Sequence, residues 1–213
     1  MDPLVPRTRR AVADSRASQA LLRAAAALGR EEQPRLYRHV HPHGHATAKL
    51  ARSFAAAAGC AREARGPTLE EIELGAHLHD FGKYLIAESI LLKPGPLTED
   101  ERAAVSFHPV YGAEVLSKLS AVTGAVRRVV LYHHERWDGL GYPEGLSGHR
   151  IPLEARVVSL ADIYTSLRAR RAYKPPLSVR EAVAVMKLMA GRELDPDMTD
   201  DFFRFIGVYE RSA

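Results

Sequence analysis

A histidine, an aspartate and a lysine stand close together near the middle of the chain. They are His79, Asp80 and Lys83, in the run His-Asp-Phe-Gly-Lys, which lies within an apolar pattern of helical period. A buried helix rarely carries an imidazole, a carboxylate and an ammonium group within one turn unless something compensates their charges. A bound metal ion would do so, and a phosphate held by that ion would account for the lysine as well.

Further side chains that can bind metals occur at intervals along the chain, most of them within helical patterns. These are His45, His108, His133, His134 and Asp162. Imidazoles and carboxylates together suit divalent ions such as iron, manganese or zinc. With His79 and Asp80 they exceed the needs of one four-coordinate zinc ion, whereas two ions bridged by Asp80 would use them all. Two ions about 3.5–4 Å apart can hold a hydroxide and clamp a phosphate for in-line hydrolysis, and Lys83 could contact a phosphate oxygen.

Each of these residues also has a structural interpretation. His108 precedes Pro109 and could begin a helix, whereas Asp162 could pair with an arginine. His133 and His134 could end a helix and interact with its dipole. These interpretations are favoured one by one, but together they would require one apolar domain to satisfy many polar groups separately.

Other histidines are less clearly assigned. His41 precedes His45 by one helical turn and could bind a third ion, but Pro42 favours an extended backbone just before it. The remaining candidates are expected at the surface or beside the ligands, and they are His39, His77 and His149.

The elements that must position these residues are predicted to be helices throughout, because no convincing alternating strand pattern occurs. Capping boxes at residues 68–71 and 98–101 begin two of them. The other predicted helices cover residues 11–28, 45–58, 109–119, 122–134, 152–167, 178–189 and 196–206. The glycine-rich stretch 137–149 cannot continue a helix, and it is predicted to be a functional loop beside the site.

The length of 213 residues and the 46% of hydrophobic residues predict one globular domain over residues 34–213. Residues 1–33 are predicted to be a helical lead-in or a linker, whose helix ends near Gly29. Cys60 is the only cysteine, so an internal disulfide is excluded, and no segment is long and apolar enough for a membrane span. A cytoplasmic location is expected. The net charge of +4 is spread over scattered arginines rather than a basic stripe, which argues against a dedicated DNA binder.

The order and spacing of these motifs resemble those of the HD-GYP family, a branch of the HD phosphohydrolases, over about residues 36–207. The matching segments are His45, His-Asp-Phe-Gly-Lys at 79–83, Leu-Lys-Pro-Gly-Pro-Leu-Thr at 92–98, His-Pro at 108–109, His-His-Glu-Arg-Trp-Asp-Gly-Leu-Gly-Tyr-Pro at 133–143, Gly-Leu at 145–146, Ile-Pro-Leu at 151–153, Ala-Arg at 155–156 and Ala-Asp at 161–162. The resemblance implies an all-helical HD-like bundle with an extended GYP loop. It also implies hydrolysis of cyclic di-GMP to the linear dinucleotide and GMP.

The resemblance further implies two or three bound ions, commonly iron or manganese. The implied ligands are His45, His79, Asp80, His108, His133, His134 and Asp162. His41 occupies the place of an acidic third-ion ligand, so two ions are expected. The residues expected to contact the substrate are Lys83, Tyr142, Arg171 and Lys174.

The chain departs from the family pattern at Thr165, Arg170 and Ala172, which leaves the chemistry intact but makes the substrate preference less certain. One alternative is a phosphohydrolase of another nucleotide, such as a mixed cyclic dinucleotide. A second is a receptor that binds without hydrolysis, against which the complete ligand set argues. A homodimer or a regulatory partner is expected to bind through the N-terminal helix.

Overall fold

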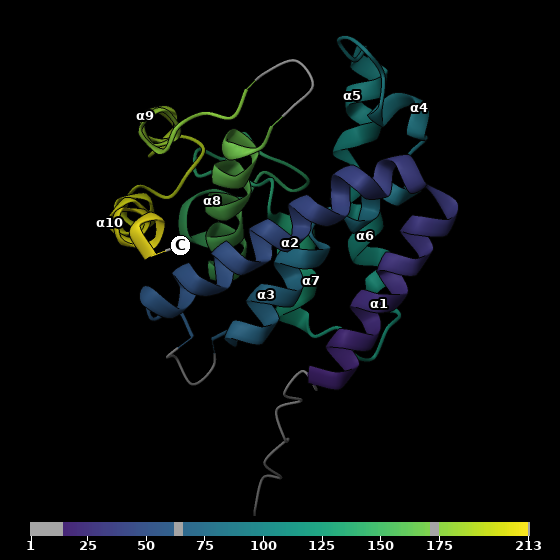
Figure 1. The fold of residues 1–213 in the computed structure, drawn as a ribbon, viewed down its shortest axis with the longest axis horizontal. Coiled ribbons are helices and arrows are strands. Elements are labelled where there is room, and N and C mark those ends of the chain that lie inside the picture. Colours follow the sequence, from purple (N-terminus) through teal and green to yellow (C-terminus); the bar gives the residue numbers. More distant parts are fainter. Residues whose placement is uncertain (1–14, 62–65, 171–174, 213) are drawn as a thin grey trace, which may run out of the picture.

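The fold is built around one long helix, α2 (Pro34–Ala57), which crosses the centre of the molecule in Figure 1. The computed structural model describes residues 15–61, 66–170 and 175–212. Helices α3 (Leu69–Leu78) and α8 (Leu153–Arg168) pack against α2, and α7 (Gly124–Tyr132) packs against both of them. Among the predicted site residues, His45 lies on α2 and Asp162 on α8, and His79 and His133 directly follow the last residues of α3 and α7.

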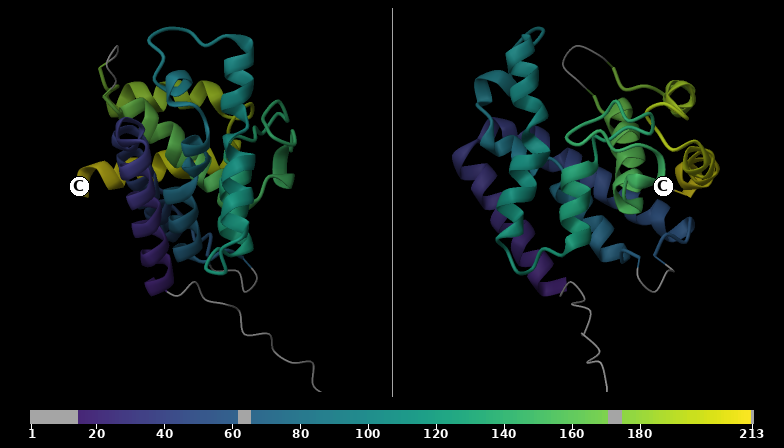
Figure 2. Two further views of the ribbon diagram at one scale, coloured as in Figure 1. Left: turned by 90° about the vertical axis from the view of Figure 1, so that its right-hand side faces the viewer. Right: turned by 180° about the vertical axis from the view of Figure 1, so that it is seen from behind.

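The remaining elements surround these four helices, as the two views in Figure 2 show. The 3₁₀ helix η1 (Phe81–Leu85) follows α3 and packs against α6 (His108–Ser117). The other helices are α1 (Ser15–Glu32), α4 (Glu88–Leu91), α5 (Glu99–Ser106), α9 (Val179–Met189) and α10 (Pro196–Ser212), with a second 3₁₀ helix, η2 (Gly148–Arg150). Within the described ranges no β-strand occurs, only an isolated bridge between Ala190 and Leu194. The predicted all-α class is confirmed.

Local sequence signals account for several helix starts. In the predicted capping box of α3, Thr68 Oγ1 accepts a hydrogen bond from the Glu71 amide at 3.1 Å, and the Glu71 carboxylate accepts one from the Thr68 amide at 2.8 Å. The box at Thr98 begins α5 in the same way, and Ser178 caps α9. These reciprocal bonds satisfy amides that a helix start otherwise leaves unpaired.

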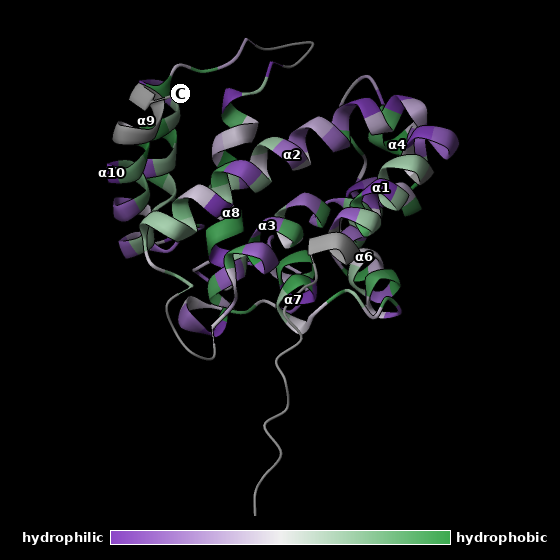
Figure 3. Ribbon diagram, turned by 60° about the horizontal axis from the view of Figure 1, so that its bottom comes forward, coloured by the Kyte–Doolittle hydropathy of each residue, from purple (hydrophilic) through white to green (hydrophobic). Residues whose placement is uncertain are grey.

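Two apolar clusters hold the helices together. The larger contains Phe54, Tyr164 and Phe202, from α2, α8 and α10, whereas the smaller contains Leu74 and Leu116, from α3 and α6. Figure 3 shows that the helices carry apolar (green) and polar (purple) positions side by side, the pattern expected of helices buried on one face. In the part of the chain that the structure describes, no helix is both long and apolar enough to cross a bilayer.

Two predicted boundaries differ from the structure. The segment before His45, predicted to be extended, is helical, because α2 passes through Pro42. Pro42 and Arg38 are both exposed, so the carbonyl of Arg38, which loses its amide partner to the proline, lies on the side that water can reach.

Gly29 was predicted to end the first helix, but it lies within α1, where a Cβ atom would stand 2.6 Å from the ring of Tyr84. Gly29 therefore allows α1 to pack closely against Tyr84 and does not end the helix. From α1, Leu21, Leu22 and Ala25 pack against the smaller apolar cluster. The domain boundary near residue 33 stays a prediction.

Candidate metal centre

The helices bring seven histidine and aspartate side chains together in two adjacent groups. The first consists of Asp80, His108, His133 and His134, and the second of His43, His79 and Asp162. Within each group, one potential ligand atom from every residue lies within 4.8 Å of the others. The residues come from α2, the ends of α3 and α7, the start of α6 and the middle of α8, so only tertiary packing joins them.

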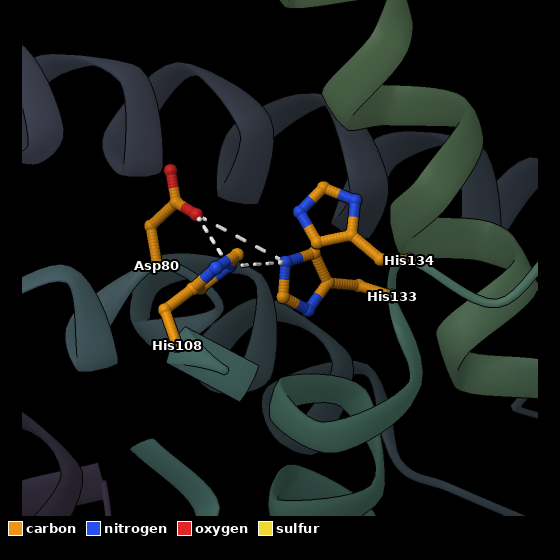
Figure 4. A group of neighbouring side chains, drawn as sticks. All are labelled: Asp80, His108, His133 and His134. Atoms are coloured by element: carbon orange, nitrogen blue, oxygen red, sulfur yellow. Dashed lines mark hydrogen bonds and ion pairs between the residues drawn. The ribbon is translucent and has the colours of Figure 1, made fainter. Parts of the chain in front are cut away.

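In the first group, one carboxylate oxygen faces a pair of imidazole nitrogens (Figure 4). Oδ1 of Asp80 lies 3.3 Å from Nε2 of His108 and 3.9 Å from Nε2 of His133. The two Nε2 atoms lie 3.3 Å from each other. The ring of His134 lies against that of His133, with 4.2 Å between the ring centroids. Three of these side chains, all but His134, are almost completely buried.

Main-chain hydrogen bonds fix the tautomer of three buried imidazoles. Nδ1 of His79 lies 2.6 Å from the carbonyl of Ala76, and His108 and His133 make the same contact, at 2.8 and 2.9 Å, with the carbonyl three residues earlier. A carbonyl can only accept, so Nδ1 must carry the proton. In the neutral ring this leaves Nε2 with its lone pair directed into the site, which is the arrangement of a metal-binding histidine.

The second group adjoins the first through Asp80. Nε2 of His43 lies 2.7 Å from Oδ1 of Asp162, and Nε2 of His79 lies 3.8 Å from the same oxygen. Nε2 of His79 also lies 3.4 Å from Oδ2 of Asp80, the oxygen that does not face His108. The two oxygens of Asp80 are therefore directed towards different groups, as a carboxylate that bridges two ions requires.

Burial and neighbouring charge act differently on the imidazoles. Burial lowers the pKa of His134 to about 4, and burial together with adjacent imidazoles holds the pKa of His133 well below its ordinary value. Burial acts in the same sense on His79, but the carboxylates of Asp80 and Asp162 outweigh it and raise the pKa of His79 to about 9. The rings of His133 and His134 thus stay neutral and able to coordinate, and the carboxylates that favour a proton on His79 would equally favour a metal cation at its Nε2.

The donor set fits a divalent metal. Among the described side chains, Nε2 of His79 and Oδ1 of Asp80 are buried and make no hydrogen bond, although burying unpaired polar atoms is costly. Both atoms lie where the two groups meet. Imidazole nitrogens and carboxylate oxygens in this proportion suit iron, manganese or zinc, and a cation would satisfy both atoms at once. The clusters therefore indicate metal binding.

Close backbone approaches at two glycines make this convergence possible. A Cβ atom on Gly82 would stand 1.9 Å from the carbonyl of His108, so only glycine lets η1 lie against the start of α6. A Cβ atom on Gly44 would stand 2.7 Å from the carbonyl of His77, where α2 crosses α3. The first approach brings Asp80 to His108, and the second brings His43 to His79.

The structure places His43, and not His45, in the donor groups. His45 is exposed, and its ring lies 5.2 Å from that of His77, on another side of α2. Two residues along an α-helix correspond to about 200° of rotation, so the two histidines cannot face the same partner. Similarly, the ring of His41 lies against that of Tyr37, with 4.7 Å between the centroids, and His41 belongs to neither group.

A sequence signal for His43 exists, although the sequence reasoning missed it. The residues four, seven and eleven positions after His43 are Thr47, Leu50 and Phe54, all buried. The residues four and seven positions after His45 are Lys49 and Arg52, neither of which is buried. The buried stripe of the helix therefore contains His43.

The predicted substrate residues are only partly described. Nζ of Lys83 lies 2.6 Å from Oδ2 of Asp80, at the more open edge of the site. Burial opposes ionisation of Asp80, but Lys83 and His79 hold the pKa of this carboxyl well below its usual value. The ring of Tyr142 stacks on His134, with 4.8 Å between the centroids. Arg171 and Lys174 lie outside the described residues.

Comparison with known proteins identifies a matching family and several relatives. Residues 22–198 match the family model described as "HD domain". The cyclic di-GMP phosphodiesterase response regulator RpfG of Xanthomonas campestris is 41% identical over 181 residues, which are 82% of this chain and 47% of that protein. The 3'3'-cGAMP-specific phosphodiesterase 2 of Vibrio cholerae is 35% identical over 130 residues, 61% of this chain and 25% of that protein.

A solved structure supports the fold. The HDG"Y"P protein Bd1817 from Bdellovibrio bacteriovorus matches with a TM-score of 0.63 at 16% identity, over 92% of this chain and 65% of that one. The chain spans less than half the length of the two relatives named above. Because the HD domain model covers most of the chain, the protein belongs to the HD domain family.

Proposed function

We propose that this domain is a metal-dependent phosphodiesterase that hydrolyses cyclic di-GMP to the linear dinucleotide, with GMP as a further product. One observation carries the proposal: Asp80 directs one oxygen to each of two adjacent donor groups, beside an ammonium group suited to phosphate. Relatives of the chain, among them RpfG, are named cyclic di-GMP phosphodiesterases.

The proposed cofactor is a pair of divalent ions, either iron or manganese. One would be held by His108, His133 and His134, the other by His43, His79 and Asp162, with Asp80 between them. When bound, such a pair supplies Lewis acidity to the phosphate and makes hydroxide available at neutral pH. A third ion is not proposed, because His41 faces Tyr37 instead of the donor groups.

The protein's own side chains would bind and orient the substrate. Lys83 carries a positive charge to the open edge of the site, where it can offset negative charge that develops on the phosphate. Tyr142 presents its ring next to His134, as a wall against which a nucleotide can lie. Arg171 and Lys174 are proposed to bind phosphate on the strength of the family resemblance alone.

A second candidate substrate is a mixed cyclic dinucleotide, because three of the similar proteins are named 3'3'-cGAMP-specific phosphodiesterases. The chain departs from the family pattern at Thr165. The hydroxyls of Thr165 and Thr47 are hydrogen-bonded at 2.9 Å, which holds α8 to α2. Turnover of cyclic di-GMP and of 3'3'-cGAMP, compared at equal concentrations, separates the two candidates. Tight binding without turnover by metal-loaded protein would support the receptor alternative.

The test of the proposed function is the Asp80→Ala variant. Protein purified without oxygen is expected to lose both its metal and its hydrolysis of cyclic di-GMP, measured by elemental analysis and by chromatography of the products. The Asp100→Ala variant is the control, because Asp100 is an exposed aspartate of α5. Retained turnover in the Asp80 variant would refute the assignment.

Three further expectations stay predictions. A homodimer or a regulatory partner would bind through the N-terminal helix, whose residues Arg23 and Ala24 are exposed. The cytoplasmic location rests on the single cysteine, Cys60. The expectation that the chain does not bind DNA rests on the scattered distribution of its arginines.

A further inference from the structure

A buried carboxylate follows the two histidines at the end of α7 and belongs to neither donor group. The side chain of Glu135 is only 3% exposed. Its Oε1 accepts a hydrogen bond from the amide of Glu144 at 2.8 Å, and its Oε2 accepts one from the amide of Leu146 at 2.9 Å. Both oxygens are thus used to hold the backbone of the glycine-rich loop that follows the histidines.

The loop lies against the same short stretch of chain at two further points. The amide of Tyr142 donates to the carbonyl of His134 at 3.3 Å. A Cβ atom on Gly141 would stand 2.4 Å from the amide nitrogen of Arg136 and 2.6 Å from Cα of Glu135, so the backbone packs closely there. Between these contacts and those of Glu135, the ring of Tyr142 is held on His134.

We propose that Glu135 is a positioning residue for the reaction: by binding the amides of Glu144 and Leu146, it holds Tyr142 against His134 and so fixes the wall that receives the nucleotide. The inference rests on the proposed function. Glu135 belongs to neither donor group, and both of its carboxylate oxygens accept hydrogen bonds from main-chain amides. Its loss therefore affects the affinity for a nucleotide substrate, while the metal content and the metal-dependent chemistry remain.

A carboxylate is the side chain that this position requires. Two amide donors need two acceptor oxygens, whereas a glutamine offers one oxygen and a competing NH₂ group. The Glu135→Gln variant keeps the size of the side chain and loses one of the two bonds. Loss of one of the two bonds, which leaves a buried amide unpaired, is expected to weaken substrate binding about tenfold.

The experiment compares Glu135→Gln with Glu144→Gln. Glu144 is exposed, and its carboxylate accepts a hydrogen bond from the hydroxyl of Tyr132. Only its main-chain amide, and not its side chain, contacts Glu135. Hydrogen exchange of residues 139–148 reports the loop without any substrate. Elemental analysis reports the metal, and the steady-state constants are measured with cyclic di-GMP and with bis(p-nitrophenyl) phosphate, a phosphodiester that lacks a nucleobase.

For Glu135→Gln we expect faster loop exchange, unchanged metal content, a KM for cyclic di-GMP raised about tenfold with little change in kcat, and unchanged turnover of bis(p-nitrophenyl) phosphate. The Glu144→Gln variant should match the wild type throughout. Faster exchange with an unchanged KM would overturn the proposal, as would a loss of metal or of bis(p-nitrophenyl) phosphate turnover. A wild type that binds no cyclic dinucleotide would refute the proposed function as well, whereas failure in the variant alone refutes only the role of Glu135.

Discussion

Nε2 of His108 lies 3.3 Å from Nε2 of His133, and Nδ1 of each ring donates to a main-chain carbonyl. With both protons placed on Nδ1, neither Nε2 has a proton to offer the other. Two lone pairs at this distance repel each other unless a cation lies between them. Oδ1 of Asp80 faces the same point and adds a negative charge. The fold therefore concentrates electron-rich donors at one place, where a bound cation would stabilise it.

Removal of the metal should lower thermal stability. An ion present at about a hundred times its Kd adds about 3 kcal/mol to the free energy of unfolding, which for a chain of this size corresponds to about 5–10 °C in Tm. Calorimetry before and after dialysis against a chelator measures the shift. Readdition of Mn²⁺ should restore the original Tm. A Tm that neither treatment changes would contradict metal binding at this site.

Substitution of His43 or His45 by alanine tests which of these two histidines of α2 binds an ion. His43→Ala should lose about one ion per chain and most of the turnover, because Nε2 of His43 contacts Asp162 at 2.7 Å. The His45→Ala variant should keep its metal content and its turnover, because His45 is exposed beside His77. The two variants share residue type and helix, so each is the control of the other. The opposite result would restore His45 as the ligand.

Glycine at position 82 should be indispensable. In Gly82→Ala the new methyl group would meet the carbonyl of His108, and a main-chain atom cannot yield as the end of a side chain can. We expect a loss of about 3 kcal/mol or more in the free energy of unfolding by urea, together with reduced metal content. Gly207→Ala is the control, because a methyl group there meets nothing within 4 Å. It should be neutral or stabilising by up to about 1 kcal/mol. An equal change in the free energy of unfolding in the two variants would contradict the close approach of Gly82 to the carbonyl of His108.

Lys83 should contribute to turnover without holding the metal. A charge-assisted hydrogen bond contributes about 1.5–3 kcal/mol, so Lys83→Met should reduce kcat/KM for cyclic di-GMP about 10- to 100-fold. Elemental analysis should find the ions still bound. Lys93→Met serves as the control, because Lys93 pairs with Glu101 at 2.7 Å, outside the donor groups. A Lys83 variant that turns over normally would remove this residue from the mechanism.

Local patterns in the sequence predict the helices well, because helix starts depend on neighbouring residues. The capping boxes at Thr68 and Thr98 are read directly from four consecutive residues. The predicted helix began at His45, whereas α2 continues N-terminally through Pro42 and places His43 in a donor group. A single helix that carries four histidines needs its buried face identified first.

Contacts between distant segments could not be predicted in the same way. That Asp80 directs its oxygens to separate groups depends on the approach of η1 to α6, which involves residues 26 positions apart. The role of Glu135 is similarly hidden, because its partners are main-chain amides that leave no pattern of residue types. The residue types indicated a metal site suited to phosphate, whereas the packing of distant segments determines which atoms face that site.

The most direct test counts ions and turnover together in the wild-type protein. Protein purified without oxygen should contain about two ions of iron or manganese per chain and convert cyclic di-GMP to the linear dinucleotide. Stepwise removal of the metal should reduce turnover in proportion to the ions lost. Undiminished turnover by protein from which all metal has been removed would contradict the account.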